Sequence, residues 1–246
     1  MSNVGAFFDI DGTLYREGMI TAIFKKLIKS EIIEQKVWYK DVKDKYERWE
    51  KRVGNYDDYL LKIAEIYVDT IKGLHRTQIE FIAKKVIEQN GDKVYQFTRD
   101  RIEWHKEQGH KVFTVSGSPI ELVREMSLKY GVTDYVGSEY VTENDVYTGE
   151  VLPMWDSKNK KVAINRLATD YDIDLAKSYA YGDTAGDFNM LKSVGNPVAM
   201  NATKELLHLL RNDDDLVNRI SIVVERKDMI YHLGLDCLEC KENIGF

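Results

Sequence analysis

Hydrophobic residues fall along the chain in two alternating patterns. Short apolar runs at 4–8, 111–115, 178–181 and 197–200 predict buried strands. Apolar residues at helical spacing fill much of the sequence between these runs. Strands that alternate with helices favour a mostly parallel sheet with helices on both faces, so the expected fold class is α/β.

A long segment after the first strand contains helical patterns alone. Apolar residues recur at helical spacing over 20–28, 60–71 and 79–87. Thr77, followed by Glu80 three residues later, has the spacing of a capping box at the start of the last of these helices. The segment therefore reads as a small helical bundle.

The two patterns together predict two domains. A core domain is expected from 1–15 and 91–246, and a helical domain, 16–90, is inserted after the first strand. We expect the remaining elements of the core as a helix ending near Gly109, helices at 119–130 and 162–171, a hairpin of 135–141 with 146–151, and an edge strand at 220–224.

Composition and charge exclude several classes of protein. The 246 residues are 43% hydrophobic and carry a net charge of −6, which is ordinary for a folded protein and unfavourable for binding nucleic acid. No apolar run is long enough to span a membrane, and no signal peptide is expected. Cys237 and Cys240 are too few for a disulfide scaffold. A zinc site would need two further ligands, and only His232 is close in sequence, so we expect ordinary thiols in a cytoplasmic protein.

Acidic residues follow the first predicted strand. Alternate residues of an extended chain point the same way, so Asp9 and Asp11 can both face a site while Ile10 turns to the core. Gly12 permits a sharp turn there. A plain surface turn is the alternative, because Asp-Gly is a common turn sequence.

The second strand is followed by Ser116, Gly117 and Ser118. Ser118 with Glu121 reads as a capping box and Pro119 as the first helical residue, which predicts a helix N-terminus at the strand end. Free backbone N–H groups at such a terminus bind anions, and Ser116 adds a hydroxyl. The alternative is a helix cap without further function.

Two more candidate features lie later in the chain. Asp183 ends a strand, and Thr184 can cap a helix with Asp187 in its first turn. With Asp9 and Asp11 this gives four carboxylates in one crevice, and hard oxygen ligands of this kind suit Mg²⁺. A loop lysine could hold a phosphate; the choices are Lys158, Lys160 and Lys161, unless all three are solvated surface.

Taken in order, these pieces resemble the haloacid dehalogenase (HAD) superfamily of phosphohydrolases. The motifs are Asp-x-Asp-Gly-Thr at 9–13, the strand-end Ser116, a lysine, and Gly-Asp-x-x-x-Asp at 182–187. The helical insertion and the register of the later motifs resemble the phosphoserine-phosphatase-like group, and this register favours Lys160. The resemblance implies a Rossmann-like core and a mobile cap over the substrate.

The same resemblance implies a mechanism. Asp9 is the expected nucleophile, which forms an aspartyl-phosphate, and Asp11 is the general acid and base. Mg²⁺ is expected on Asp9, the backbone carbonyl of Asp11 and Asp183. Ser116, Gly117 and Lys160 are expected to bind the phosphoryl group. Thr13 has a supporting role, and Asp187 is expected to orient Lys160 or a metal-bound water.

The chain departs from the phosphoserine phosphatases at two positions. Glu17 lies one position before the place of their substrate-binding Glu, which Gly18 occupies, and Gly186 replaces an Asn. The expected function is therefore hydrolysis of a small phosphate monoester, with Glu17 as a candidate specificity residue and phosphoserine not strongly preferred. A phosphotransferase remains an alternative, as does a phospho-accepting signalling module. Asp11 argues against a dehalogenase, since a halide leaves without a proton.

Overall fold

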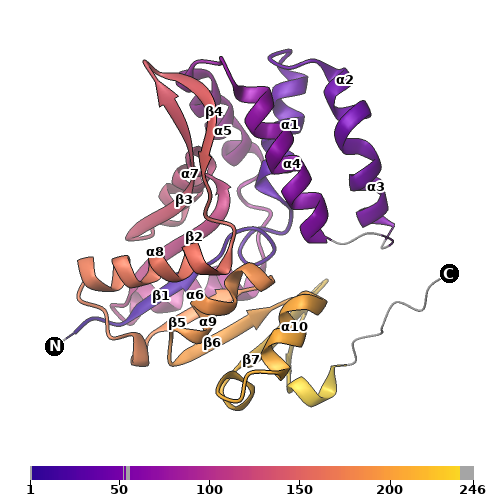
Figure 1. Cartoon of the computed structure of the whole chain (residues 1–246). Coiled ribbons are helices and arrows are strands. Elements are labelled where there is room, and N and C mark those ends of the chain that lie inside the picture. The colour runs from indigo at the N-terminus through magenta and orange to yellow at the C-terminus, as the bar shows by residue number, and fades with distance from the viewer. Residues whose placement is uncertain (1, 52, 54–55, 239–246) are drawn as a thin grey trace.

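The structure is a computed structural model that describes residues 2–51, 53 and 56–238 (Figure 1). Its eight-stranded sheet has the order β4-β3-β2-β1-β5-β6-β7-β8. All neighbouring pairs are parallel except the hairpins β3–β4 and β7–β8. The strands are β1 Gly5–Phe8, β2 Lys111–Pro119, β3 Asp134–Glu143, β4 Val146–Leu152, β5 Tyr179–Gly182, β6 Asn196–Met200, β7 Ser221–Arg226 and β8 Met229–Leu233.

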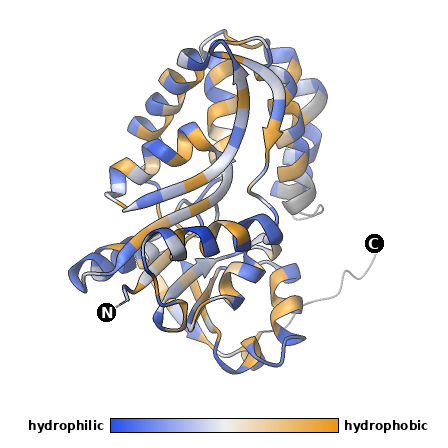
Figure 2. Cartoon of the chain, turned by 60° about the vertical axis from the view of Figure 1, so that its left-hand side comes forward, coloured by the Kyte–Doolittle hydropathy of each residue, from blue (hydrophilic) through white to orange (hydrophobic). Residues whose placement is uncertain are grey.

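Helices cover both faces of this sheet, which confirms the predicted α/β class. Apolar residues lie along one side of many helices and hydrophilic residues along the other (Figure 2). The α-helices are α1 Met19–Lys29, α2 Gln35–Val37, α3 Lys43–Glu50, α4 Tyr56–Ile71, α5 Arg76–Asn90, α6 Gln96–Glu107, α7 Ile120–Tyr130, α8 Ser157–Asp170, α9 Phe188–Lys192 and α10 Lys204–Arg211. Among the described residues, no helix is long and apolar enough to cross a membrane.

Alternate residues of the central strand β1 belong to two separate cores. Phe8 stacks on Tyr181 in one core, with ring centroids 4.2 Å apart. Phe7 stacks on Phe113 in the other, at 5.0 Å. A strand that is buried on both faces has no room for charge until it ends, so the acidic residues of its neighbourhood begin at Asp9.

The segment between Tyr15 and Val94 contains α1 to α5, gathered at one end of the molecule (Figure 1). Its two ends lie side by side, because Tyr15 pairs with Val94 and the Arg16 N–H donates to the Lys93 carbonyl. The hairpin β3–β4 also contacts this segment, since Tyr147 exchanges backbone hydrogen bonds with the turn between α4 and α5. These helices are therefore joined to the rest of the structure at two places, the junction at Tyr15 and Val94 and the hairpin β3–β4.

A carboxylate from the far end of the sheet fastens the start of α6. Glu225, in β7, accepts hydrogen bonds from the backbone N–H groups of Gln96 and Phe97 and pairs with Arg16 at 3.0 Å. The α6 N-terminus lacks a side-chain cap of its own. Glu225 therefore satisfies donors that the helix leaves free and holds them beside the start of the inserted segment.

Several local predictions were wrong. The cap of α5 is His75 with Gln78, and not Thr77 with Glu80. Strand β2 continues to Pro119, so α7 begins at Ile120. The strand expected at the sheet edge is β7, but β8 pairs with it and forms the edge instead. Strand β8 was missed because its alternating pattern is short. The expected helix at 162–171 begins five residues earlier, at Ser157.

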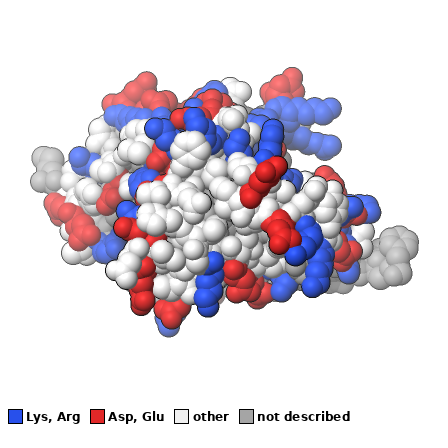
Figure 3. Space-filling view, turned by 90° about the horizontal axis from the view of Figure 1, so that it is seen from above, with Lys and Arg blue, Asp and Glu red and all other residues white. Residues whose placement is uncertain are grey.

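The surface carries mixed charge. Acidic and basic side chains are interspersed on the face seen from above the inserted helices (Figure 3). This arrangement matches the spread of charge along the sequence. Cys237 is exposed and is not part of a disulfide among the described residues, and Cys240 lies outside those residues.

Candidate active site

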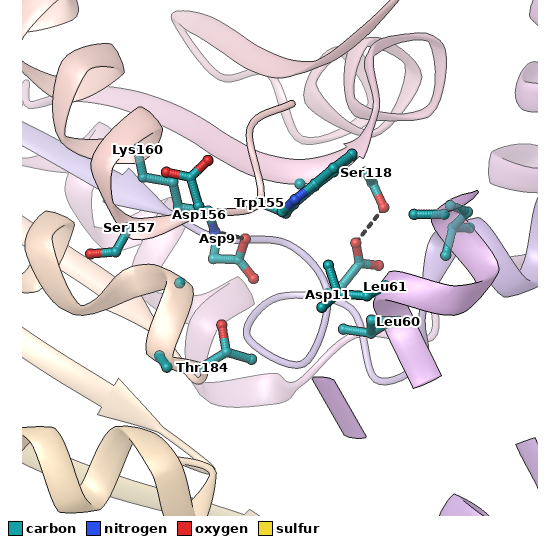
Figure 4. A pocket seen from close by; sticks show the side chains of 15 residues that line it. Asp9, Asp11, Leu60, Leu61, Ser118, Trp155, Asp156, Ser157, Lys160 and Thr184 are labelled. Carbon is teal, nitrogen blue, oxygen red and sulfur yellow. Dashed lines mark hydrogen bonds and ion pairs between the residues drawn. The ribbon is translucent and has the colours of Figure 1, made fainter. Parts of the chain in front are cut away.

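A cavity of about 480 Å³ lies at the carboxyl ends of the central strands. Strand β1 lies between β2 and β5, so the residues that follow these three strands meet at one edge of the sheet. Asp9, Asp11 and Gly117 line the cavity, as do Lys160 and Thr184 (Figure 4). The structure thus brings together groups from four distant parts of the sequence.

Three carboxylates form a compact buried cluster beside the cavity. Oxygen atoms of Asp9, Asp183 and Asp187 lie within 4.8 Å of one another. Burial raises the pKa of Asp9 to about 8, with a smaller contribution from neighbouring carboxylates. Burial and the Asp9 charge also raise the pKa of Asp183 well above its usual value. Such crowding is relieved by a cation, and the oxygen donor set fits Mg²⁺.

The turn after β1 is shaped around Asp183. Gly12 has a φ of +83°, and a Cβ there would lie 2.0 Å from Oδ2 of Asp183. The hydroxyl of Thr13 donates to the other Asp183 oxygen at 2.9 Å. The glycine of the first motif is therefore needed for its backbone and for the space that it leaves, and Thr13 orients the carboxylate.

Lys160 lies in the first turn of α8, whereas the sequence predicted a loop. Asp156 caps this helix by accepting from the Asn159 N–H at 2.9 Å. The Lys160 Nζ lies 2.6 Å from Oδ1 of Asp9 and 2.6 Å from Oδ1 of Asp187. Burial alone would lower the pKa of Lys160, but these two carboxylates raise it above its usual value.

The other two candidate lysines differ from Lys160 in exposure. Lys160 is 3% exposed, while Lys158 and Lys161 project into solvent. Helical periodicity explains the difference, because one residue in the first turn of α8 faces the sheet and its neighbours do not.

Asp187 uses both of its oxygens in hydrogen bonds. Oδ1 accepts from Lys160, and Oδ2 accepts from the Asp183 N–H and from the N–H and hydroxyl of Thr184. The predicted local arrangement of Thr184 and Asp187 is thus present. An aspartate held in this way orients Lys160 and the loop after β5.

Asp11 lies in the same cavity and is held by two donors. The Ser118 hydroxyl donates to Oδ2, and the Met19 N–H at the start of α1 donates to Oδ1 at 2.6 Å. Burial raises the pKa of Asp11, and these hydrogen bonds oppose that effect. The capping box expected from Ser118 and Glu121 does not form, since β2 is still extended at Ser118 and its hydroxyl points to Asp11.

The two residues of β2 that were predicted to bind phosphate differ in their access to the cavity. Gly117 lines the cavity, whereas Ser116 is fully buried and its hydroxyl accepts from the Ser118 N–H at 3.2 Å. Ser118 was missed as a site residue. Its position two residues after Ser116 on an extended strand was the available signal, because such residues share a face.

Glu17 is the one candidate that the structure places apart. Its side chain is 60% exposed, lies 3.8 Å from Lys93, and does not line the cavity. The sequence also gave no sign of Trp155, which lies between Asp9 and Ser118 in Figure 4.

Comparison with known proteins supports the family suggested by these motifs. A family model described as haloacid dehalogenase-like hydrolase matches residues 6–192. The chain is 27% identical over 209 residues to the "Inhibition of morphological differentiation protein" of Streptomyces azureus, which covers 84% of this chain and 74% of that protein. It is 28% identical over 121 residues to a phosphoserine phosphatase of Mycobacterium tuberculosis, covering 49% and 39% of the two chains.

A solved structure shares the fold. The structure titled "Phospho-Aspartyl Intermediate Analogue of Phosphoserine phosphatase" matches with a TM-score of 0.58 and 21% identity, over 93% of this chain and 96% of that one. The chain belongs to the haloacid dehalogenase-like hydrolase family, because the family model covers most of its length. It is a hydrolase of that family, and its similarity to a phosphoserine phosphatase agrees with the phosphoserine-phosphatase-like group that the sequence motifs predicted.

Proposed function

We propose that this phosphatase hydrolyses small phosphate monoesters with Mg²⁺, through a phosphoryl group carried on Asp9. The observation that supports this most directly is the cluster in which Asp9, Asp183 and Lys160 meet at the cavity. An anionic nucleophile, a cation site and a fixed ammonium are the groups that phosphoryl transfer requires.

The metal would be held by the carboxylates of Asp9 and Asp183 and by the backbone carbonyl of Asp11. When bound, Mg²⁺ would neutralise the repulsion between the nucleophile and the phosphate. The raised pKa of Asp9 fits this role for a cation, since without one the buried carboxyl takes up a proton and is a poor nucleophile.

The chain's own residues would carry out the covalent steps. An Asp9 oxygen attacks phosphorus, the bond to the leaving alcohol breaks, and Asp11 gives its proton to the leaving oxygen. Asp11 then takes a proton from water, whose oxygen attacks phosphorus and releases phosphate and Asp9. Asp11 lies on the cavity wall two residues after Asp9. This position suits the transfer of a proton first to the leaving oxygen and then from water.

The phosphoryl oxygens would be held by Lys160 and the Gly117 N–H, with the Ser116 hydroxyl behind them. Thr13 and Asp187 would support this arrangement through Asp183 and Lys160 respectively. We further propose that 16–90 forms the cap domain over the core of 1–15 and 91–246. Its backbone hydrogen bonds with β4 join it to the hairpin β3–β4.

Release of inorganic phosphate from a panel of monoesters with Mg²⁺ tests this function. Asp9→Asn should lower turnover by at least about 100-fold, because the amide cannot form the ester intermediate. Asp100→Asn, on the exposed face of α6, is the matched control and should retain wild-type activity. Retention of more than a few per cent of activity by a folded Asp9→Asn protein would reject the nucleophile.

Phosphoryl transfer to an acceptor other than water is the second candidate. The same residues would perform it, so an assay of products with and without an added alcohol distinguishes the two reactions.

A further inference from the structure

Part of the wall of the cavity is apolar. Ile20 of α1, Leu61 and Ala64 of α4, and Leu60 beside them supply this wall. Leu61 lines the cavity and is 48% exposed, so part of its apolar side chain is uncovered. Figure 4 shows Leu60 and Leu61 on the Asp11 side of the cavity.

Trp155 completes this wall and is placed there by two glycines. A Cβ on Gly117 would lie 2.8 Å from the Trp155 Cβ, and a Cβ on Gly186 would lie 2.5 Å from the Trp155 carbonyl oxygen. The chain at Trp155 thus fits between the last residues of β2 and the loop that follows β5. The Gly at 186, where related phosphatases have Asn, makes room for this segment.

The charged groups on the lining are all engaged within the protein. Lys160 is paired with Asp9 and Asp187, and Asp156 accepts two hydrogen bonds from Asn159. Asp11 accepts from Ser118 and Met19. Among the described residues of the lining, therefore, the one cation is already paired, and each carboxylate already accepts hydrogen bonds or pairs with Lys160.

We propose that the preferred substrates are phosphate monoesters of apolar alcohols, whose hydrocarbon part packs between Leu61 and Trp155. This inference rests on the proposed phosphatase function and narrows it. Transfer of a hydrocarbon group from water to such a wall is favourable, whereas an ammonium or carboxylate placed there loses its hydration without gaining a partner.

A series of n-alkyl phosphates tests the proposal without a change in the reactivity of the leaving group. With ethyl, propyl, butyl and hexyl phosphate, kcat/KM should rise by up to about fourfold for each methylene that enters the cavity. Propyl phosphate should exceed phosphoethanolamine, which is similar in size but charged, by at least about tenfold. The kcat/KM for phosphoserine should be lower than that for phosphoethanolamine.

Two leucine variants locate the effect. Leu61→Ser should reduce the dependence of kcat/KM on chain length, because it replaces part of the apolar wall with a hydroxyl. Leu128→Ser is the matched control, since Leu128 is 66% exposed on α7 and does not line the cavity. It should keep the wild-type dependence. Equal slopes in both variants would place the alkyl chain elsewhere and overturn the assignment.

Exchange of oxygen between inorganic phosphate and labelled water separates the two levels of proposal, because it needs Asp9 and Mg²⁺ but no leaving alcohol. One result is oxygen exchange with a kcat/KM that stays constant along the alkyl series or is higher for phosphoethanolamine. That result would overturn the apolar substrate class and leave the phosphatase mechanism standing. Absence of both exchange and hydrolysis would reject the mechanism and the substrate class together.

Discussion

Lys160 and Asp187 form a buried ion pair in which Nζ lies 2.6 Å from Oδ1. The same ammonium lies 2.6 Å from Asp9, so one lysine is shared by the nucleophile and by a carboxylate that is itself held by three donors. This sharing fixes the ammonium at the edge of the cavity. It also explains how a lysine can remain charged at a site with 3% exposure.

The first prediction separates the three lysines of α8. Lys160→Ala should lower kcat/KM by at least about 100-fold, since a buried charge-assisted contact to the phosphoryl group is lost. Lys158→Ala and Lys161→Ala remove exposed charges and should each change it by less than about fivefold. Steady-state kinetics on the three variants, with circular dichroism to check folding, makes the comparison. A larger loss at Lys158 or Lys161 would contradict the role of Lys160.

The second prediction concerns the hydroxyl that holds Asp11. The hydrogen bond from Ser118 stabilises ionised Asp11, so Ser118→Ala should raise the pKa of that carboxyl. The limb of the pH–rate profile that Asp11 controls should move to higher pH, whether donation or removal of the proton limits turnover. Ser193→Ala removes a hydroxyl at the end of α9 that donates to the Asn189 carbonyl, and it should leave the profile unchanged. An unshifted limb in Ser118→Ala would show that Asp11 does not control it.

The third prediction links metal binding to protons. In the metal-free site burial raises the pKa of Asp9 to about 8, so the carboxyl binds a proton more readily than an exposed aspartate does. Mg²⁺ needs the ionised form; its binding should therefore release protons, and its affinity should rise between pH 6 and pH 8. Calorimetry in buffers of different ionisation enthalpy measures the release. EDTA should abolish activity and Mg²⁺ restore it, with Ca²⁺ much poorer because its coordination shell is larger and looser.

The fourth prediction concerns stability away from the site. His105 is fully buried against Tyr181, at 2.9 Å, and burial lowers its pKa to about 3. Below pH 6.5 the unfolded chain takes up a proton at this position and the folded chain does not, so stability is lost as the pH falls. Between pH 7.5 and pH 5.5 this loss should be up to about 1.4 kcal/mol.

Urea unfolding of the wild type and of His105→Asn at these two pH values measures that difference. The variant should be less stable at pH 7.5 but should lose less stability on acidification, because its Asn does not titrate. The carboxyls with raised pKa values act in the opposite direction in both proteins and cancel in the comparison. Identical pH dependence in the two proteins would exclude His105 as its source.

Strand ends were predictable because they depend on local patterns. Asp9, Asp11 and Asp183 each follow a short apolar run, and the topology of a parallel sheet then brings them to one edge. Lys160 required more: charge and spacing left three lysines equal, and only the resemblance to a known family chose among them. Its burial depends on the rotation of α8 against the sheet, which the sequence does not reveal.

The wrong local predictions arose from competition with tertiary contacts. Ser118 satisfies the pattern of a helix cap, but pairing of β2 with β3 keeps it extended and Asp11 takes its hydroxyl. Trp155 gave no local signal at all. Its place is set by the space above Gly117 at the end of β2 and above Gly186 after β5, two positions that are distant in the sequence.

The adjacent ends of the inserted segment have a consequence for how such enzymes diversify. Arg16 and Lys93 are hydrogen-bonded neighbours. The pairing of β1 with β2 therefore does not depend on how many residues lie between Arg16 and Lys93. Loop closure becomes less favourable by only about 0.6 kcal/mol for each doubling of length. Recombination at this junction can therefore exchange the whole module, and with it the face offered to the alcohol, while the catalytic sheet is inherited intact.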